Sequence, residues 1–228
     1  MIQTIYAEVP REKIEHLTRP GFIDGTEQSF HDDLKGVMKK NGFNLLSNIG
    51  RRNILLSEAQ ERYFSEALSR KYEVICDGST GEPDILISSL NRELECKLTS
   101  RHKSGAISFQ SDHDTLVKKG PLDYLYVVAD FQFEKFAVIH YTDLTIDDFR
   151  PLSSGSRGKT QMMKYKSSDR ARVLVGAMKN VNKESLFKLS KKMRNARSEK
   201  QREKIKKSII YWNNTPTRYR VEMEAVNA

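Results

Sequence analysis

The sequence predicts an α/β protein in which a central mixed β-sheet is flanked by helices and followed by a basic, partly helical C-terminal region. Three observations support this fold class: helical apolar spacing in residues 26–71, strands separated by one helix in residues 72–141, and a lysine-rich and arginine-rich stretch near the C-terminus. Helices that precede and interrupt a run of strands are typical of a covered sheet. We expect one compact domain with an N-terminal helical region, a core and a basic C-terminal region, at residues 1–56, 57–149 and 150–228.

Two helices are expected before the first strand. The first begins at Thr26, which can cap it, and ends at the pair Asn41-Gly42, which stops helices. The second begins with Ser57 as its N-cap, and the early glutamates there suit the positive end of the helix dipole. Its apolar residues recur at helical spacing at Ala59, Tyr63, Phe64, Ala67 and Leu68.

Short runs of β-branched and aromatic residues mark the strands of the sheet. They lie at residues 72–76, 84–87, 92–98, 123–129 and 135–141. A polar turn between the second and third runs predicts a hairpin, and a helix at 112–119 precedes the fourth run. After Phe149 the chain is polar and basic, so residues 151–170 are expected to form a loop.

Two further segments complete the C-terminal region. Residues 182–207 are predicted to be helical, and eleven Lys or Arg against three Glu give them a local charge of about +8. The tail that follows suggests one or two short strands around a turn at Pro216. Its aromatic residues are expected to lie in the core, at Tyr211, Trp212 and Tyr219.

The whole chain is basic, with 39 Lys and Arg against 30 Asp and Glu and a pI near 9.4. Such an excess favours anionic partners, with nucleic acid first and an anionic membrane surface second. Simple solubility is the alternative explanation.

Cysteine usage and the lack of targeting signals indicate the compartment. Cys76 and Cys96 both fall within apolar runs and are expected to be buried, reduced thiols, and neither has His or Cys neighbours at zinc-site spacing. The N-terminal residues do not have the pattern of a signal peptide, and the apolar runs are too short to span a membrane. We therefore expect a cytoplasmic protein with no membrane partner.

The sharpest pattern is Pro83-Asp84, followed after ten residues by Glu95-Cys96-Lys97. Strand side chains alternate between faces, so Glu95 and Lys97 share one face while Cys96 points to the other. Asp84 begins the neighbouring strand, and a tight hairpin would bring its carboxylate close to Glu95. The acid and the amine are therefore expected to project together into a cleft.

This pattern has two interpretations. Carboxylates on adjacent strands, at Asp84 and Glu95, are oxygen ligands that suit Mg²⁺, which stabilises charge on a scissile phosphate and lowers the pKa of a bound water. Lys97 would position or help deprotonate that water. The alternative is a solvated ion pair between Glu95 and Lys97, which Glu93 on the same face favours.

The segment ERYFSEALSRKYEVICDGSTGEPDILISSLNRELECKLTS is similar to the core of the PD-(D/E)xK nuclease superfamily, which includes type II restriction endonucleases and Holliday junction resolvases. The resemblance covers about residues 57–141. It implies a restriction-endonuclease-like mixed sheet with Mg²⁺ held at Asp84 and Glu95, and with Lys97 as the third catalytic residue. Members often carry a metal-binding glutamate on the preceding helix, and Glu61 matches that place, with Glu58 and Glu66 as weaker candidates.

Residues after the core motif are predicted to contact DNA. Some relatives carry a glutamine just after the core motif, where Gln110 lies. In the basic loop, arginine and glutamine can reach base edges and lysine can reach phosphates, while the basic helical stretch would follow the phosphate backbone. The predicted contacts are Gln110, Arg157, Lys159, Gln161, Lys164, Lys166, Lys191 and Arg194.

Together these observations favour a type II restriction endonuclease that hydrolyses phosphodiester bonds of double-stranded DNA at a short specific site. The resemblance and the two-fold symmetry of such sites imply a homodimer. Two alternatives stay open. One is a structure-specific DNA repair or junction-resolving nuclease with the same core, and the other is a non-catalytic DNA-binding protein.

Overall fold

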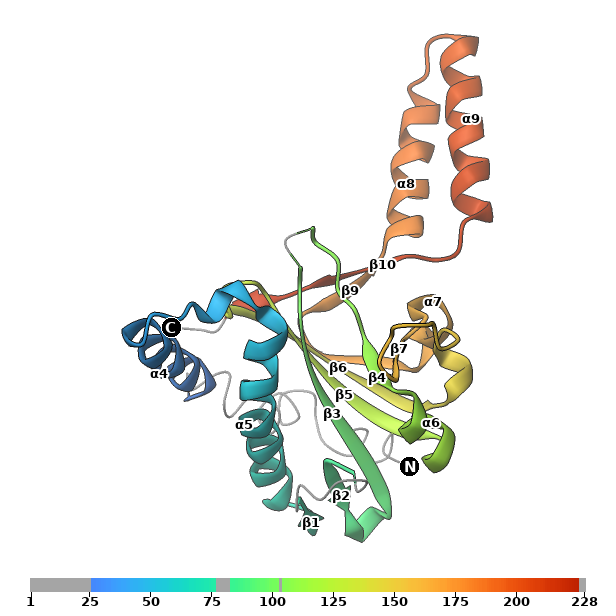
Figure 1. Cartoon of the computed structure of the whole chain (residues 1–228). Coiled ribbons are helices and arrows are strands. Elements are labelled where there is room, and N and C mark those ends of the chain that lie inside the picture. Colours follow the sequence, from blue (N-terminus) through green and yellow to red (C-terminus); the bar gives the residue numbers. More distant parts are fainter. Residues whose placement is uncertain (1–25, 77–82, 103, 226–228) are drawn as a thin grey trace.

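A computed structural model describes residues 26–76, 83–102 and 104–225 of the chain. The short segments at residues 1–25 and the turn cluster at 77–82 lie outside the described residues. Within the described ranges a twisted sheet runs through the middle of the molecule, with helices on both of its faces (Figure 1). The predicted α/β class with a mixed, helix-flanked sheet is confirmed.

The central sheet has seven strands, in the order β1-β2-β3-β5-β6, with β8 and β11 both pairing with β6. Strands β3 and β5 are parallel, and the other pairs of this sheet are antiparallel. The strands are β1 Val74–Ile75, β2 Ile85–Ile87, β3 Arg92–Ser100, β5 Leu122–Ala129, β6 Lys135–Leu144, β8 Ala171–Val175 and β11 Glu224–Ala225. All five predicted strand runs therefore contain a strand, although the first is shorter than expected.

The two faces of the sheet bury separate apolar clusters. On one face the helix α5 (Ile49–Ser69) packs Leu56 and Phe64 against Leu94 and Cys96 of β3. The opposite face is covered by α6 (His113–Lys119) and by a ribbon of two short strands, β4 (Gln110–Asp112) and β7 (Lys159–Gln161). Tyr124, Tyr126 and Tyr141 lie in that second cluster. Successive β3 side chains therefore face α5 and the ribbon in turn.

The N-terminal helices differ partly from the prediction. Helix α4 (Thr26–Lys40) matches it, but α5 begins eight residues earlier than expected, at Ile49, with Asn48 as its N-cap. The Asn48 Oδ1 accepts a hydrogen bond from the backbone N–H of Arg51 at 3.0 Å. The prediction that Ser57 caps this helix is wrong, because the Ser57 hydroxyl donates to the carbonyl of Ile54 inside the helix.

The C-terminal region contains more regular structure than predicted. The expected loop at 151–170 includes β7 and a one-turn helix, α7 (Lys164–Ser167), and the strands β8 and β9 (Ala177–Asn180) follow it. The basic stretch is two helices, α8 (Val181–Arg194) and α9 (Glu199–Asn214), because Ser198 starts a new helix by accepting from the N–H of Gln201. Strand β10 (Tyr219–Glu222) then pairs with β9.

Two burial predictions are wrong. Cys76 is exposed, because it follows β1, a two-residue edge strand, whereas Cys96 is buried as expected. Of the three aromatic residues expected in the core, Tyr211 is 53% exposed, because it lies on α9, which has little core of its own, and Trp212 and Tyr219 are only half-buried. In the described part of the chain no helix is both long enough and apolar enough to cross a bilayer.

Candidate active site

The predicted hairpin joins β2 to β3 in antiparallel register, with Ile85 opposite Leu94. Asp84 immediately precedes this pairing, and its Oδ2 accepts a hydrogen bond from the backbone N–H of Cys96 at 2.7 Å. The carboxylate thus takes the place that the next backbone carbonyl of β2 would occupy. Beyond this point β3 has no neighbouring strand on its β2 side among the described residues, so its edge opens at the site.

Asp84, Glu95 and Lys97 meet as the sequence predicts. The Lys97 Nζ lies 2.6 Å from Glu95 Oε1 and 3.2 Å from Asp84 Oδ2. The Glu95 side chain is only 11% exposed and that of Lys97 only 27%. The ion pair of the alternative interpretation therefore exists, but it is largely removed from solvent.

The protonation of Lys97 follows from its neighbours. Burial lowers the pKa of this amine, but the charges of Glu95 and Asp84 outweigh burial and hold the pKa above its usual range. Lys97 is therefore an ammonium group that donates hydrogen bonds, which suits positioning a phosphate or a water better than removing a proton. The other acid on this face, Glu93, pairs with Lys119 of α6 at 3.1 Å.

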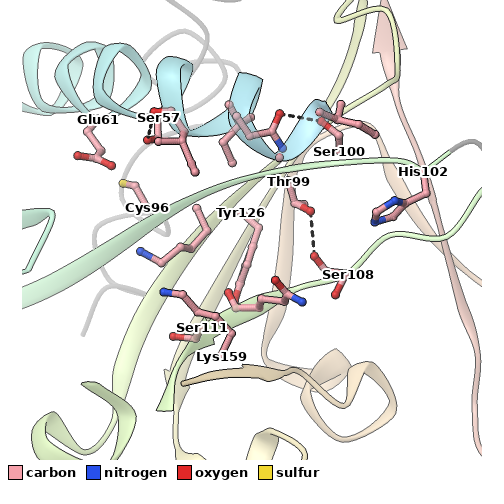
Figure 2. A pocket seen from close by; sticks show the side chains of 17 residues that line it. Ser57, Glu61, Cys96, Thr99, Ser100, His102, Ser108, Ser111, Tyr126 and Lys159 are labelled. Carbon is pink, nitrogen blue, oxygen red and sulfur yellow. Dashed lines mark hydrogen bonds between the residues drawn. The ribbon is translucent and has the colours of Figure 1, made fainter. Parts of the chain in front are cut away.

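Glu61 approaches from the helix α5 and lines the same pocket as Lys97. Burial raises the pKa of its carboxyl to about 7, and the negative charge of Asp84 adds to that effect, while Lys97 opposes it. The predicted fourth member of the site is thus electrostatically coupled to the other three. Figure 2 shows Glu61 directed from the helix toward β3, where Cys96 lies.

A polar pocket of about 570 Å³ lies along the open edge of β3. One wall is the N-terminal half of α5, and the other is the β4–β7 ribbon, from which Ser111 and Lys159 approach in Figure 2. The pocket extends past Thr99 to His102. The small polar side chains that line the pocket could not be predicted from the sequence. They form no motif, and α5 was expected to begin only at Ser57. These residues include Asn53, Ser57, Thr99, Ser108 and Ser111.

Two buried tyrosines hold the ribbon over the sheet. The Tyr126 hydroxyl donates to the carbonyl of Gln110 at 2.9 Å, and the hydroxyls of Tyr124 and Ser111 lie 2.7 Å apart. Burial raises the pKa of Tyr124 to about 12, so its hydroxyl stays protonated at neutral pH. The aromatic run of β5 thus positions the second wall of the pocket.

Three of the predicted DNA contacts lie together on this ribbon. Gln110 and Lys159 line the pocket, and Lys159 also pairs with Asp112 at 3.3 Å. Gln161, opposite Gln110 in the ribbon, donates to the Ser108 hydroxyl at 3.0 Å. Arg157 is exposed in the turn that leads into β7, with a φ of 52°.

The remaining predicted contacts lie elsewhere. The Lys164 Nζ donates to the carbonyl of Ile107 at 2.6 Å and lies 4.9 Å from the centre of the Phe109 ring, and burial lowers its pKa. Lys166 donates to the carbonyl of Asp147 at 3.3 Å. Both amines are thus engaged by the protein itself, away from the pocket. The other two, Lys191 and Arg194, are exposed on α8.

The side chains available as metal ligands limit how a metal ion could be held. Across the described ranges no group of three or more His, Cys, Asp or Glu side chains could enclose an ion. Mg²⁺ does not need such a cage, because it commonly binds one or two carboxylates and keeps several waters. Asp84 and Glu95 contact the same ammonium nitrogen, so their carboxylates already converge on one point. The pair therefore fits Mg²⁺, and Glu61 does not complete a three-ligand group.

Comparison of the chain with protein-family models and with curated proteins finds no match in either set. The chemical assignment therefore depends on the site itself. Its distinguishing features are a half-buried ammonium shared by two carboxylates and a polar pocket beside the open edge of β3, the strand that carries Glu95 and Lys97.

Proposed function

We propose that this protein is a Mg²⁺-dependent deoxyribonuclease, and specifically a type II restriction endonuclease that cuts double-stranded DNA at a short site. One observation carries the proposal. The carboxylates of Asp84 and Glu95 converge on the ammonium of Lys97, and Lys97 in turn lines a polar pocket at the strand edge together with Glu61. This is the donor set that hydrolysis of a phosphodiester needs.

The energetic cost of this arrangement supports a functional role. Removing an ammonium and two carboxylates from water costs several kcal/mol per ion, and their mutual attraction recovers only part of that cost, so such clusters are poor stabilisers. Glu61 adds a further acid whose pKa is raised to about 7. Groups perturbed by both burial and specific charges in a pocket are typical of catalytic sites.

Each side chain has a distinct part in the proposed reaction. Asp84 and Glu95 would hold the magnesium ion, which when bound supplies charge stabilisation and a more acidic water. Lys97 would donate to a phosphoryl oxygen and offset its negative charge. Glu61, whose pKa is near neutrality, can accept a proton at the pocket wall.

The ribbon beside the pocket supports DNA as the substrate. Gln110, Lys159 and Gln161 come from its two strands, and amide and ammonium groups of this kind read base edges and contact phosphates. We propose a homodimer, because a two-fold enzyme would present one such site to each strand of a palindromic sequence.

Digestion of plasmid DNA tests the function directly. Incubation with MgCl₂ should give discrete fragments, and excess EDTA should abolish them. Cutting confined to branched DNA would instead indicate a junction-resolving nuclease, and binding without cleavage would indicate a DNA-binding protein.

Variants of the core test the assigned residues. Asp84→Ala and Lys97→Ala should each lower the cleavage rate by about 100-fold or more while DNA binding is largely retained. Glu93→Gln is the matched control, because Glu93 lies on the same face of β3 but pairs with Lys119 outside the core. Cleavage by Asp84→Ala at the wild-type rate would show that the assignment is wrong.

A further inference from the structure

The helices α8 and α9 form an antiparallel pair, residues 181–214, which we call the helical arm. In Figure 1 the arm stands away from the sheet at the end of the β9–β10 ribbon. The two helices bury little surface between them, because Asn182 and Ile205 are the only residues of these helices that are buried. Apolar packing therefore does not explain why the arm exists.

The arm holds nearly all of the net charge of the protein. Of 39 basic and 30 acidic residues in the chain, 11 and 3 lie in the arm, which leaves 28 and 27 in all the rest. The remainder of the molecule is thus almost neutral, and the positive charge is concentrated on one projecting element.

Most of these cations are not neutralised by the protein. Within the arm, Arg202 pairs with Glu199 at 3.9 Å and Lys206 with Glu203 at 2.7 Å. The other basic side chains have no acidic partner in the described part of the chain: Lys183, Lys188, Lys191, Lys192, Arg194, Arg197, Lys200, Lys204 and Lys207. Like charges at helical spacing repel one another and destabilise helices, so the cluster costs stability unless an anionic ligand binds it.

The arm is also firmly held at its base. The buried Asn182 side chain donates to the carbonyls of Thr215 at 3.0 Å and Trp212 at 3.3 Å, and accepts from the N–H of Arg218 at 2.9 Å. These bonds join the start of α8 to the segment that leaves α9. The two helices are therefore joined to each other at the base of the arm by hydrogen bonds of a buried side chain.

The β9–β10 ribbon, which we call the stalk of the arm, is tied to β3, the strand that carries Glu95 and Lys97. Arg101, directly after β3, donates a hydrogen bond to the carbonyl of Val221 in β10. The next residue, His102, lines the far end of the polar pocket. This end of the pocket therefore lies close to β10, one of the two strands that lead to the arm.

We propose that the helical arm binds the phosphate backbone of duplex DNA outside the cut site, without reading its sequence. The DNA partner rests on the proposed nuclease function, whereas the binding role of the arm is a separate claim. Helix α9 spans 16 residues, about 24 Å, and so covers about seven base pairs of duplex. The exposed side chains of Phe187 and Tyr211 lie among the cations and can pack against sugars.

The test compares two triple variants that remove the same charge. Lys188, Lys191 and Lys192 of the arm are changed to Gln in one, and Lys35, Lys39 and Lys40 of α4 are changed to Gln in the other. All six side chains are exposed on helices, and Gln keeps helix propensity close to that of Lys. Binding of a labelled 30-base-pair duplex is measured by fluorescence anisotropy in EDTA, across a range of salt concentrations, and circular dichroism verifies folding.

The arm variant should bind the duplex at least about tenfold more weakly than wild type. The slope of log Kd against log salt concentration should be smaller than that of wild type by about 1 for each lysine that contacts a phosphate. The α4 variant should bind like wild type. Equal losses in both variants, or no loss in the arm variant, would overturn the proposal. So would arm-dependent binding to vesicles of anionic phospholipid without binding to DNA. Because EDTA prevents cleavage, the result does not depend on whether the protein is a nuclease.

Discussion

The guanidinium of Arg52 donates a hydrogen bond from Nη2 to the hydroxyl of Ser100 at 2.6 Å. Arg52 lies on α5, two to three turns before Glu61, and Ser100 is the last residue of β3. The same guanidinium donates from Nη1 to the carbonyl of Phe131 at 2.7 Å. A fully buried arginine thus fixes the helix that carries Glu61 against the strand that carries Lys97.

Replacing this arginine should destabilise the whole domain. Arg52→Met leaves the hydroxyl of Ser100 and the carbonyl of Phe131 without their donor, so the free energy of unfolding should fall by about 2–4 kcal/mol. Urea denaturation measures the change. Arg51→Met is the control, because Arg51 is exposed on the same helix turn and its loss should change stability by less than about 0.5 kcal/mol. Equal stability of the two variants would contradict this role.

The raised pKa of Glu61 predicts a pH-dependent stability difference. Its folded-state pKa is about 7, above the ordinary 4.5, so the folded protein holds this proton more tightly than the unfolded chain. The stability that the proton contributes is present below pH 4.5 and is lost as the pH rises through 7. Glu61→Gln should therefore match wild type near pH 4.5 and be more stable by about 1–3 kcal/mol above pH 7.

Chemical denaturation at pH 4.5, 6 and 8 would follow this difference. Glu58→Gln is the control, because Glu58 is exposed on the same helix and its charge adds less to the raised pKa of Glu61 than burial or Asp84 does, so this variant should depart from wild type far less than Glu61→Gln. A constant offset for Glu61→Gln across the range would show that the carboxyl titrates normally.

The position of Lys97 between two carboxylates predicts how Mg²⁺ should change the Tm of a variant that lacks this lysine. The change can be measured without a cleavage assay. Lys97→Met leaves Asp84 and Glu95 facing the same point with no cation between them, and their repulsion should lower the Tm at neutral pH. A divalent ion should then offset that repulsion, so millimolar MgCl₂ should raise the Tm of Lys97→Met more than that of wild type. An equal Mg²⁺ response in the triple variant Asp84→Asn/Glu95→Gln/Lys97→Met would show that the ion binds elsewhere.

Gly176 lies where the stalk leaves no room for a side chain, so a substitution there should destabilise the protein. It adopts a φ of 81° between β8 and β9, and a Cβ there would lie 2.3 Å from the carbonyl oxygen of Glu222 in β10. Gly176→Ala should therefore push β9 and β10 apart and lower the free energy of unfolding by about 2–4 kcal/mol. Gly158→Ala is the matched control, with a similar φ of 77° but open space around its Cβ, and should cost only about 1 kcal/mol.

Limited proteolysis would add a local readout for the stalk. Cleavage in residues 215–218, which join α9 to β10, should be faster in Gly176→Ala than in Gly158→Ala. The same protease sensitivity in both variants would show that the close approach at Gly176 does not hold the stalk.

The strands of the candidate site could be predicted from the sequence because two local rules agree there. Alternation placed Glu95 and Lys97 opposite Leu94 and Cys96, and the short polar turn set the hairpin that brings Asp84 alongside. The first two turns of α5 could not be predicted in this way. They bury Arg52 and expose Ile54, which is 73% exposed, so the hydrophobic pattern is the reverse of what a covering helix shows.

The C-terminal region was harder to predict for a different reason. The strands β4 and β7 read QSD and KTQ, with no apolar alternation; the hydroxyls of Tyr124 and Tyr126 bond to β4 from beneath, and β7 pairs with β4. The tail IIYW suggests a strand by composition, yet it continues α9, because a helix that has begun at Ser198 gains one hydrogen bond for each residue it adds.

The concentration of charge on the helical arm gives the molecule a large electric dipole, with a near-neutral body at one end and a cationic pole at the other. In the field of a polyanion such a molecule experiences a torque as well as an attraction, so it would be oriented with the arm leading before any contact forms. Association should therefore be fast at low ionic strength and slow steeply as salt screens the field. A protein lacking residues 181–214 would lie close to its isoelectric point at neutral pH, and it would lose both this orientation and the electrostatic repulsion that keeps copies apart.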